Sequence, residues 1–145
     1  MKFRTLAFAL AAVAASACAT AADDSMVIRS DRAQVEAFAG SPVETVARRP
    51  LRNNERWESL GDFALLIWET RTKAWLLDLE RDDEQCRDLS DEYMMHIDET
   101  ANWLSSGNSH IELHNGRWCT ITQIRPVDAK ALRAARKSQG ISSPY

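Results

Sequence analysis

The chain has 145 residues, and its 18 Lys and Arg against 21 Asp and Glu give a formal net charge of −3. Without the first 22 residues, which hold two basic and no acidic side chains, the charge is −5 over a length that suits one domain. This acidic balance excludes nucleic-acid binding as the main role, because that role requires a basic surface, and it argues against a purely electrostatic hold on anionic lipids.

The first 22 residues have the order of an export signal. Lys2 and Arg4 are followed by an apolar run over residues 6–15 and then by small residues over 16–22. The apolar run is about half as long as the roughly 20 residues that a membrane-spanning helix requires. We therefore expect residues 1–22 to be a signal peptide and the mature protein to be exported.

Cys18 lies inside this processing region and leaves two routes open. Cleavage after Ala21, with Ala19-Thr20-Ala21 as the small-residue site, would release a soluble protein into the periplasm. Cleavage before Cys18 would instead place lipid on its sulfur and hold the protein on the outer membrane, the only membrane contact that we expect. The residues before Cys18 lack the large aliphatic side chain typical of lipoproteins, which favours the soluble form.

The N-terminal part of the mature chain predicts a tether and one helix. Residues 23–30 are polar and are expected to be flexible. Either Ser30 or Asp31 can cap a helix that extends to about Ala39, where Gly40 ends it.

Two apolar runs then predict a strand hairpin. The continuous run from Phe63 to Trp68 is typical of a strand covered on both faces. The run from Ala74 to Leu79 alternates instead, with Asp78 on the face opposite to its large apolar neighbours. The polar residues 70–73 between the runs lack the Gly or Asn of a typical hairpin turn.

A second hairpin is predicted near the C-terminus. The alternating residues 110–114 and the strand-like residues 117–125 flank Asn115-Gly116, the strongest short-range hairpin signal, and we expect positive φ at both turn positions. Residues 93–97 are a further candidate strand. Pro126 is expected to end the last strand.

A short C-terminal helix is expected from Asp128 to about Lys137, followed by a frayed tail over 138–145. The predicted fold is thus a single α+β domain over 31–137. It has an N-terminal helix, an antiparallel sheet of about five or six strands that could curl toward a barrel, and a short C-terminal helix. The last helix is basic and can touch anionic lipid, but its apolar side is mostly alanine, which favours a solvated helix.

Cys86 and Cys119 are the two cysteines of the predicted domain. In an oxidising compartment, two lone cysteines are most simply a disulfide. This bridge would close a loop of about 34 residues and stabilise the fold by about 3.5–4 kcal/mol. A free nucleophilic thiol is the alternative, but neither cysteine lies in a Cys-x-x-Cys pair or a cysteine-hydrolase signature.

The best metal candidate is His110-Ile111-Glu112-Leu113-His114. On a strand, His110, Glu112 and His114 point to one face, and two imidazoles with a carboxylate are a familiar ligand set for zinc or iron. The three positions extend over about 13 Å, so a straight strand cannot bring all of them to one ion. The alternative is the solvent face of a hairpin.

Five tryptophans allow a second ligand hypothesis. Trp68 and Trp75 lie in the apolar hairpin and are expected in the core. Trp103 and Trp118 are less determined, and an exposed indole could stack on a sugar ring as part of a glycan-binding site.

The sequence predicts no cofactor and no assembled catalytic residues. It has no serine-nucleophile turn, no glycine-rich phosphate loop and no dinucleotide fingerprint. The leading hypothesis is a non-catalytic protein of the cell envelope that acts by binding or by supporting a structure, with no partner identified. The alternatives are a metal-dependent activity and glycan binding.

Several short motifs between about Pro42 and Arg133 occur in a characteristic order. They are Gly61-Asp62, Ala64-Leu65, Trp68, Ala74-Trp75-Leu76-Leu77-Asp78-Leu79, Cys86, Asp88-Leu89 and Cys119-x-Ile121-x-x-Ile124-Arg125-Pro126-Val127-Asp128-x-Lys130-Ala131-Leu132-Arg133. This order resembles an uncharacterised family of small exported or lipoprotein-like proteins of Gram-negative bacteria, known as a domain of unknown function. The resemblance supports the paired cysteines and the export signal, and it implies no reaction. The acidic residues 81–85 and the His-x-Glu-x-His pattern depart from the family.

Overall fold

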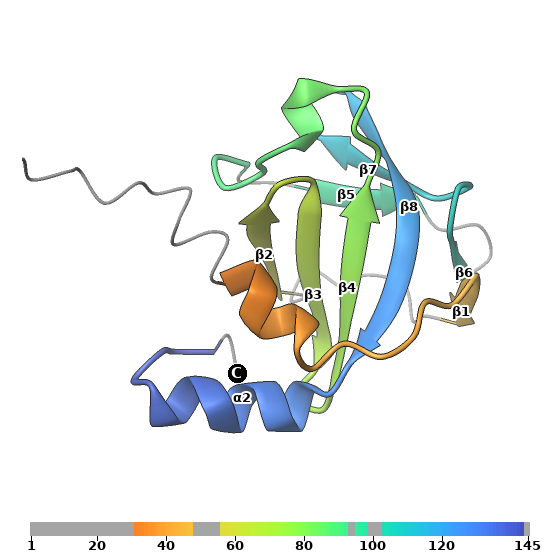
Figure 1. Ribbon diagram of the computed structural model, residues 1–145. Helices are drawn as coiled ribbons and strands as arrows, with labels where there is room; N and C mark the ends of the chain where they lie inside the picture. The colour runs from red at the N-terminus through yellow and green to blue at the C-terminus, as the bar shows by residue number, and fades with distance from the viewer. Residues whose placement is uncertain (1–30, 48–55, 93–94, 99–102, 144–145) are drawn as a thin grey trace, which may run out of the picture.

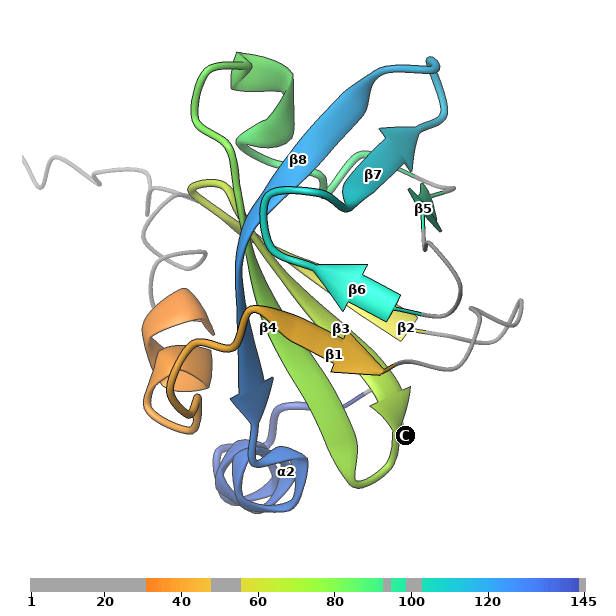
Figure 2. The same ribbon diagram turned by 90° about the vertical axis from the view of Figure 1, so that its right-hand side faces the viewer.

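The computed structural model describes residues 31–47, 56–92, 95–98 and 103–143, and its main body is a curled antiparallel sheet of six strands in the order β2-β3-β4-β8-β7-β5 (Figures 1 and 2). These strands are β2 (Arg56–Gly61), β3 (Ala64–Thr70), β4 (Lys73–Leu79), β5 (Met95–Asp98), β7 (His110–Leu113) and β8 (Trp118–Val127). A second small sheet pairs β1 (Thr45–Ala47) with β6 (Trp103–Ser105). With a helix near each end of the described chain, this arrangement confirms the predicted α+β class. The predicted signal peptide, tether and Ser30 cap lie outside the described residues.

The predicted β3–β4 hairpin is confirmed. All five residues from Ala64 to Trp68 are buried, because alternate side chains of β3 enter two different cores. Thr70 pairs with Lys73, so the hairpin closes over a two-residue turn that needs no glycine. The continuous apolar run therefore reflects a strand covered on both faces, as predicted.

The two cores lie on opposite faces of the curled sheet. The first fills the inside of the curl, where β1, β5, β6 and β7 add their apolar side chains to those of the central strands; its largest fully buried members include Leu65, Ile67, Leu77, Leu89, Ile97, Leu104, Ile111 and Ile121. The second lies between the outer face and the helices; it comprises Val35, Leu60, Ala64, Leu66, Trp68, Ala74, Leu76, Val127, Ala129 and Leu132.

Both helices lie on the outer face of the sheet (Figure 1), and their apolar side chains belong to the second core. Residues 31–36 are helical and bury Val35. Helix α2 (Ala129–Ser138) begins where the Asp128 side chain accepts a hydrogen bond from the Ala131 N–H at 2.9 Å, as expected of a cap. Within the described residues, neither helix has the length and apolar character needed to span a membrane.

Arg136 is an unexpected member of the outer core. Its side chain on α2 is 2% exposed, and its Nη1 donates to both carboxylate oxygens of Glu58 on β2, at 2.9 and 2.8 Å. The indole Nε1 of Trp68 donates to the same carboxylate at 2.7 Å. A partly buried ion pair therefore joins α2 to β2 and β3, and the basic residues of α2 do not form one solvated stripe.

The turn of the second hairpin differs from the prediction. Leu113 and Arg117 close it with an N–H to carbonyl bond of 2.8 Å, and Gly116 donates to the Leu113 carbonyl at 2.9 Å. Gly116 has φ +77°, whereas Asn115 does not have a positive φ. The loop thus has three residues, a type I turn followed by a left-handed glycine, instead of a two-residue turn with two positive φ values.

Pro126 does not end β8, which continues to Val127. The Pro126 carbonyl accepts from Gly40 at 2.7 Å, and the Ile124 carbonyl accepts from Val43 at 2.9 Å. Residue 126 therefore directs its backbone groups toward residues 40–43 and away from β4. The missing proline N–H costs no hydrogen bond in the β4–β8 ladder, which explains why the prediction was wrong.

Candidate functional site

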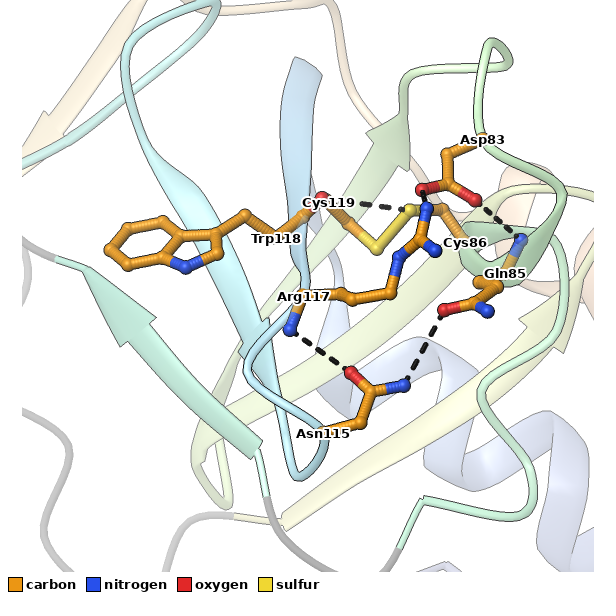
Figure 3. The surroundings of a disulfide bond; sticks show 7 residues. All are labelled: Asp83, Gln85, Cys86, Asn115, Arg117, Trp118 and Cys119. Atoms are coloured by element: carbon orange, nitrogen blue, oxygen red, sulfur yellow. Dashed lines mark hydrogen bonds and ion pairs between the residues drawn. A yellow bond between two sulfur atoms is a disulfide. The ribbon is translucent and has the colours of Figure 1, made fainter.

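The predicted Cys86–Cys119 pairing is confirmed by the two sulfur atoms, which lie 2.09 Å apart. Cys86 ends the 3₁₀ helix η1 (Glu84–Cys86), Cys119 lies on β8, and both side chains are buried. The bridge ties the acidic residues before Cys86 to the second hairpin, as Figure 3 shows.

Polar contacts around the bridge fix the same two segments to each other. Arg117 forms an ion pair with Asp83, and the Asn115 amide donates to Gln85 at 3.4 Å (Figure 3). Asp83 also caps η1, since its carboxylate accepts from the Gln85 N–H at 3.0 Å. This backbone hydrogen bond, together with Arg117, lowers the pKa of Asp83 below its usual value.

The three residues of the His-x-Glu-x-His pattern are not brought together. His110 and Glu112 lie on the outward face of β7, but His114 lies in the turn, and its Nδ1 is 2.5 Å from the Glu92 carboxylate. Among the residues that the structure describes, no group of three or more His, Cys, Asp or Glu side chains is placed to hold a metal ion. The predicted zinc or iron set is therefore not assembled as one group.

Strand pairing instead creates a different cluster, which we call the Trp118 face: His96, His110, Glu112 and Trp118. Glu112 lies directly opposite His96 of β5 on one side and Trp118 of β8 on the other. The His110 ring meets the Trp118 indole edge-on, with 5.6 Å between ring centroids. No spacing in the sequence linked His96 to this pair; only the strand register does.

The exposed tryptophans do not share one surface. Trp118 is 48% exposed and points away from the disulfide (Figure 3). Trp103 is 49% exposed but lies on β6, paired with Ala47 of the small sheet. Trp68 and Trp75 are buried, as predicted. Of the two candidate aromatics, Trp118 is the one whose indole lies beside the polar side chains of His110 and Glu112.

A hollow of about 600 Å³ lies between the N-terminal helix and β4 and β8. We call it the arginine cleft, after Arg32 and Arg125. Arg32 donates to Asp78 at 2.6 Å and to Glu36 at 2.9 Å, and Arg125 donates to Glu36 at 3.2 Å. Its charges are thus largely paired with one another.

The pKa shifts in the arginine cleft follow from these ion pairs. Partial burial alone would lower the pKa of Arg32, but its hydrogen bond to Glu36 and the charge of Asp78 outweigh burial and raise it. Burial alone would raise the pKa of Glu36, but Arg32 and Arg125 outweigh it and lower the value. Both shifts favour the ionised forms, so the cleft acts as a clamp between helix and sheet.

Sequence reasoning missed the arginine cleft. The one usable signal was Asp78, the charged residue within the apolar run from Ala74 to Leu79 of β4. Its partner Arg32 is 46 residues away in sequence, and no local pattern predicts their contact.

A family model matches residues 1–143 and decides which family this chain is part of. The chain belongs to the family of unknown function DUF6491. No curated protein and no solved structure matches it. DUF6491 membership agrees with the resemblance to a domain of unknown function, and it assigns no reaction to the disulfide, the Trp118 face or the arginine cleft.

Proposed function

We propose that this DUF6491 protein is exported to the cell envelope and that it acts there by binding or by supporting a structure rather than by catalysis. The observation that carries the proposal is the buried Cys86–Cys119 pair at disulfide distance. Structural disulfides form in oxidising compartments, whereas cytosolic thiols are kept reduced. The basic, apolar and small-residue order of residues 1–22 supports the same location.

The electrostatics of the arginine cleft argue against acid–base catalysis by its charged groups and favour a structural role for them. A general acid or base works best with a pKa near the operating pH. In the cleft the pKa of Glu36 is lowered and that of Arg32 is raised, so both groups are held away from neutrality. Both charged groups are therefore suited to stabilising the contact between the N-terminal helix and the sheet.

Cell fractionation with thiol labelling tests the proposal. The full-length chain is expressed in a Gram-negative host, and each fraction is denatured and treated with a maleimide reagent before and after reduction. We expect the protein in the envelope fractions, with Cys86 and Cys119 labelled only after reduction. Recovery from the cytosol with both cysteines labelled before reduction would contradict the proposal.

A second candidate function is glycan binding at the Trp118 face. The observation that favours it is the half-exposed indole next to Glu112, whose carboxylate has no hydrogen-bond or ion-pair partner within the described part of the chain. An indole face can stack on the apolar face of a sugar ring, and a carboxylate accepts hydrogen bonds from hydroxyl groups.

Tryptophan fluorescence with soluble peptidoglycan fragments tests this candidate. We expect quenching or a spectral shift that Trp118→Phe weakens and that the matched variant Trp103→Phe retains. Unchanged emission of the wild type, or the same response in Trp118→Phe, would exclude the Trp118 face as the glycan site.

A further inference from the structure

We propose that the outward side of α2 binds the phosphate-bearing headgroups of anionic phospholipids in a membrane. The site is a groove of about 370 Å³, here called the α2 groove, lined by Lys130, Arg133, Ala134, Lys137, Ile141, Ser142 and Ser143. This surface lies across α2 from the outer core and is separate from the arginine cleft and the Trp118 face.

The helix geometry gathers positive charge on this side. Lys130, Arg133 and Lys137 are spaced by three and four residues, so their side chains share one face of α2. Arg136 turns its side chain toward the outer core, where Glu58 neutralises it. The lining of the groove contains no Asp or Glu. The nearest acidic residue in the sequence, Asp128, is engaged as the helix cap.

Two of the cations are available to a ligand. Lys130 and Lys137 are exposed and have no ion pair with any residue that the structure describes. Arg133 is placed at the rim, where its Nη1 donates to the Arg71 carbonyl in the β3–β4 turn at 3.3 Å. Ammonium groups beside this groove match the charge of a phosphodiester.

An apolar side chain beside these cations favours a lipid over a free anion. Ile141 is 42% exposed, one of three large hydrophobic side chains exposed among the described residues. Its backbone is fixed by a hydrogen bond from its N–H to the Arg136 carbonyl at 2.9 Å, so the side chain is held at the groove. An isoleucine can enter the boundary between headgroups and acyl chains, whereas inorganic phosphate gains nothing from it.

The negative charge of the whole chain does not prevent this contact. Screening limits electrostatic interactions to about 10 Å at 0.1 M salt, so the membrane responds to the nearest side chains. Each Lys or Arg near an anionic surface increases binding about fivefold, and Lys130 and Lys137 together account for roughly 30-fold. The composition argument against anionic lipids therefore holds for the average surface and not for the α2 groove.

Vesicle co-sedimentation of the mature chain, from residue 22, tests the proposal. We expect binding to vesicles of phosphatidylglycerol with phosphatidylcholine and little binding to phosphatidylcholine alone. Lys130→Ala/Lys137→Ala should reduce binding roughly 30-fold. The matched control Arg81→Ala/Arg87→Ala removes the same charge from exposed residues near η1 and should retain binding. Circular dichroism checks that both variants are folded.

Three outcomes would overturn the proposal. The first is equal binding to both vesicle types, and the second is an equal loss in the control variant. The third concerns the source of the phosphate. We expect Ile141→Ser to weaken vesicle binding, and we expect inorganic phosphate to compete no better than sulfate at the same ionic strength. Unchanged binding by Ile141→Ser together with specific competition by phosphate would mean that the groove takes a soluble anion.

Discussion

Removing the disulfide should cost a large part of the stability of the fold. Cys86 and Cys119 are 33 residues apart in sequence, and closing a loop of this size restricts the unfolded chain. The chain-entropy relation gives about 3.8 kcal/mol at 25 °C for the free energy of unfolding. For a domain of this size that loss corresponds to a fall in the melting temperature of about 15 °C.

Urea unfolding of the mature chain, followed by tryptophan emission, measures this loss. The wild type is compared with and without reductant, and Cys86→Ala/Cys119→Ala is measured under both conditions. Alanine is preferred to serine because both positions are buried and a hydroxyl there would need a partner. We expect the reduced wild type and the double variant to be similarly destabilised, and reductant to leave the variant unchanged. A double variant within about 1 kcal/mol of the oxidised wild type would refute the reasoning, because loop closure would then contribute little.

Three further predictions follow from the ion pairs and the cap. Arg136→Leu leaves the partly buried Glu58 carboxylate without its ion-pair partner and should lower the unfolding free energy by about 1.5–3 kcal/mol in urea melts, whereas Arg133→Leu, outside that pair, should cost much less. The pKa of Glu36 is lowered by the arginines of the cleft, and that of Asp88 is lowered because hydrogen bonds from Ser59 and Ser90 outweigh its partial burial. The stability that these shifts contribute is fully present above the ordinary values of 4.5 and 3.8 and is lost as the pH falls through the lowered values. Melting temperatures from pH 7 to 3 should show this decline, and a Glu36→Gln variant with the same decline would contradict the contribution of Glu36. Asp128→Ala removes the cap of α2 and should cost about 1 kcal/mol in the same melts, while Asp128→Asn should retain most of it.

The sequence predicted the parts of the fold that depend on local patterns. The burial of residues 64–68 on both sides, the β7–β8 hairpin and the cap at Asp128 each follow from a run of neighbouring residues. The error at Pro126 has a different origin. Whether a proline ends a strand depends on which neighbour its N–H would face, and residues 40–43 are far away in sequence.

The candidate sites were harder to predict because they are made by strand register and by long-range ion pairs. His96 reaches Glu112 only through the pairing of β5 with β7, and Arg32 reaches Asp78 only when the N-terminal helix packs on the sheet. In the sequence, the four basic residues of α2 lie within eight positions and suggest a single basic stripe along the helix. The structure buries Arg136 against Glu58 and leaves the other three outside, a division that depends on the packing of β2.

The mass of the intact protein, purified from the soluble and membrane fractions of the envelope, tests the central claim most directly. The account predicts a chain that begins at residue 22, or one that begins at Cys18 and carries lipid, in either case lighter by two hydrogens because Cys86 and Cys119 are joined. Recovery of the protein from the cytosol alone, with the mass of the unprocessed chain of 145 residues and both thiols reduced, would contradict the account.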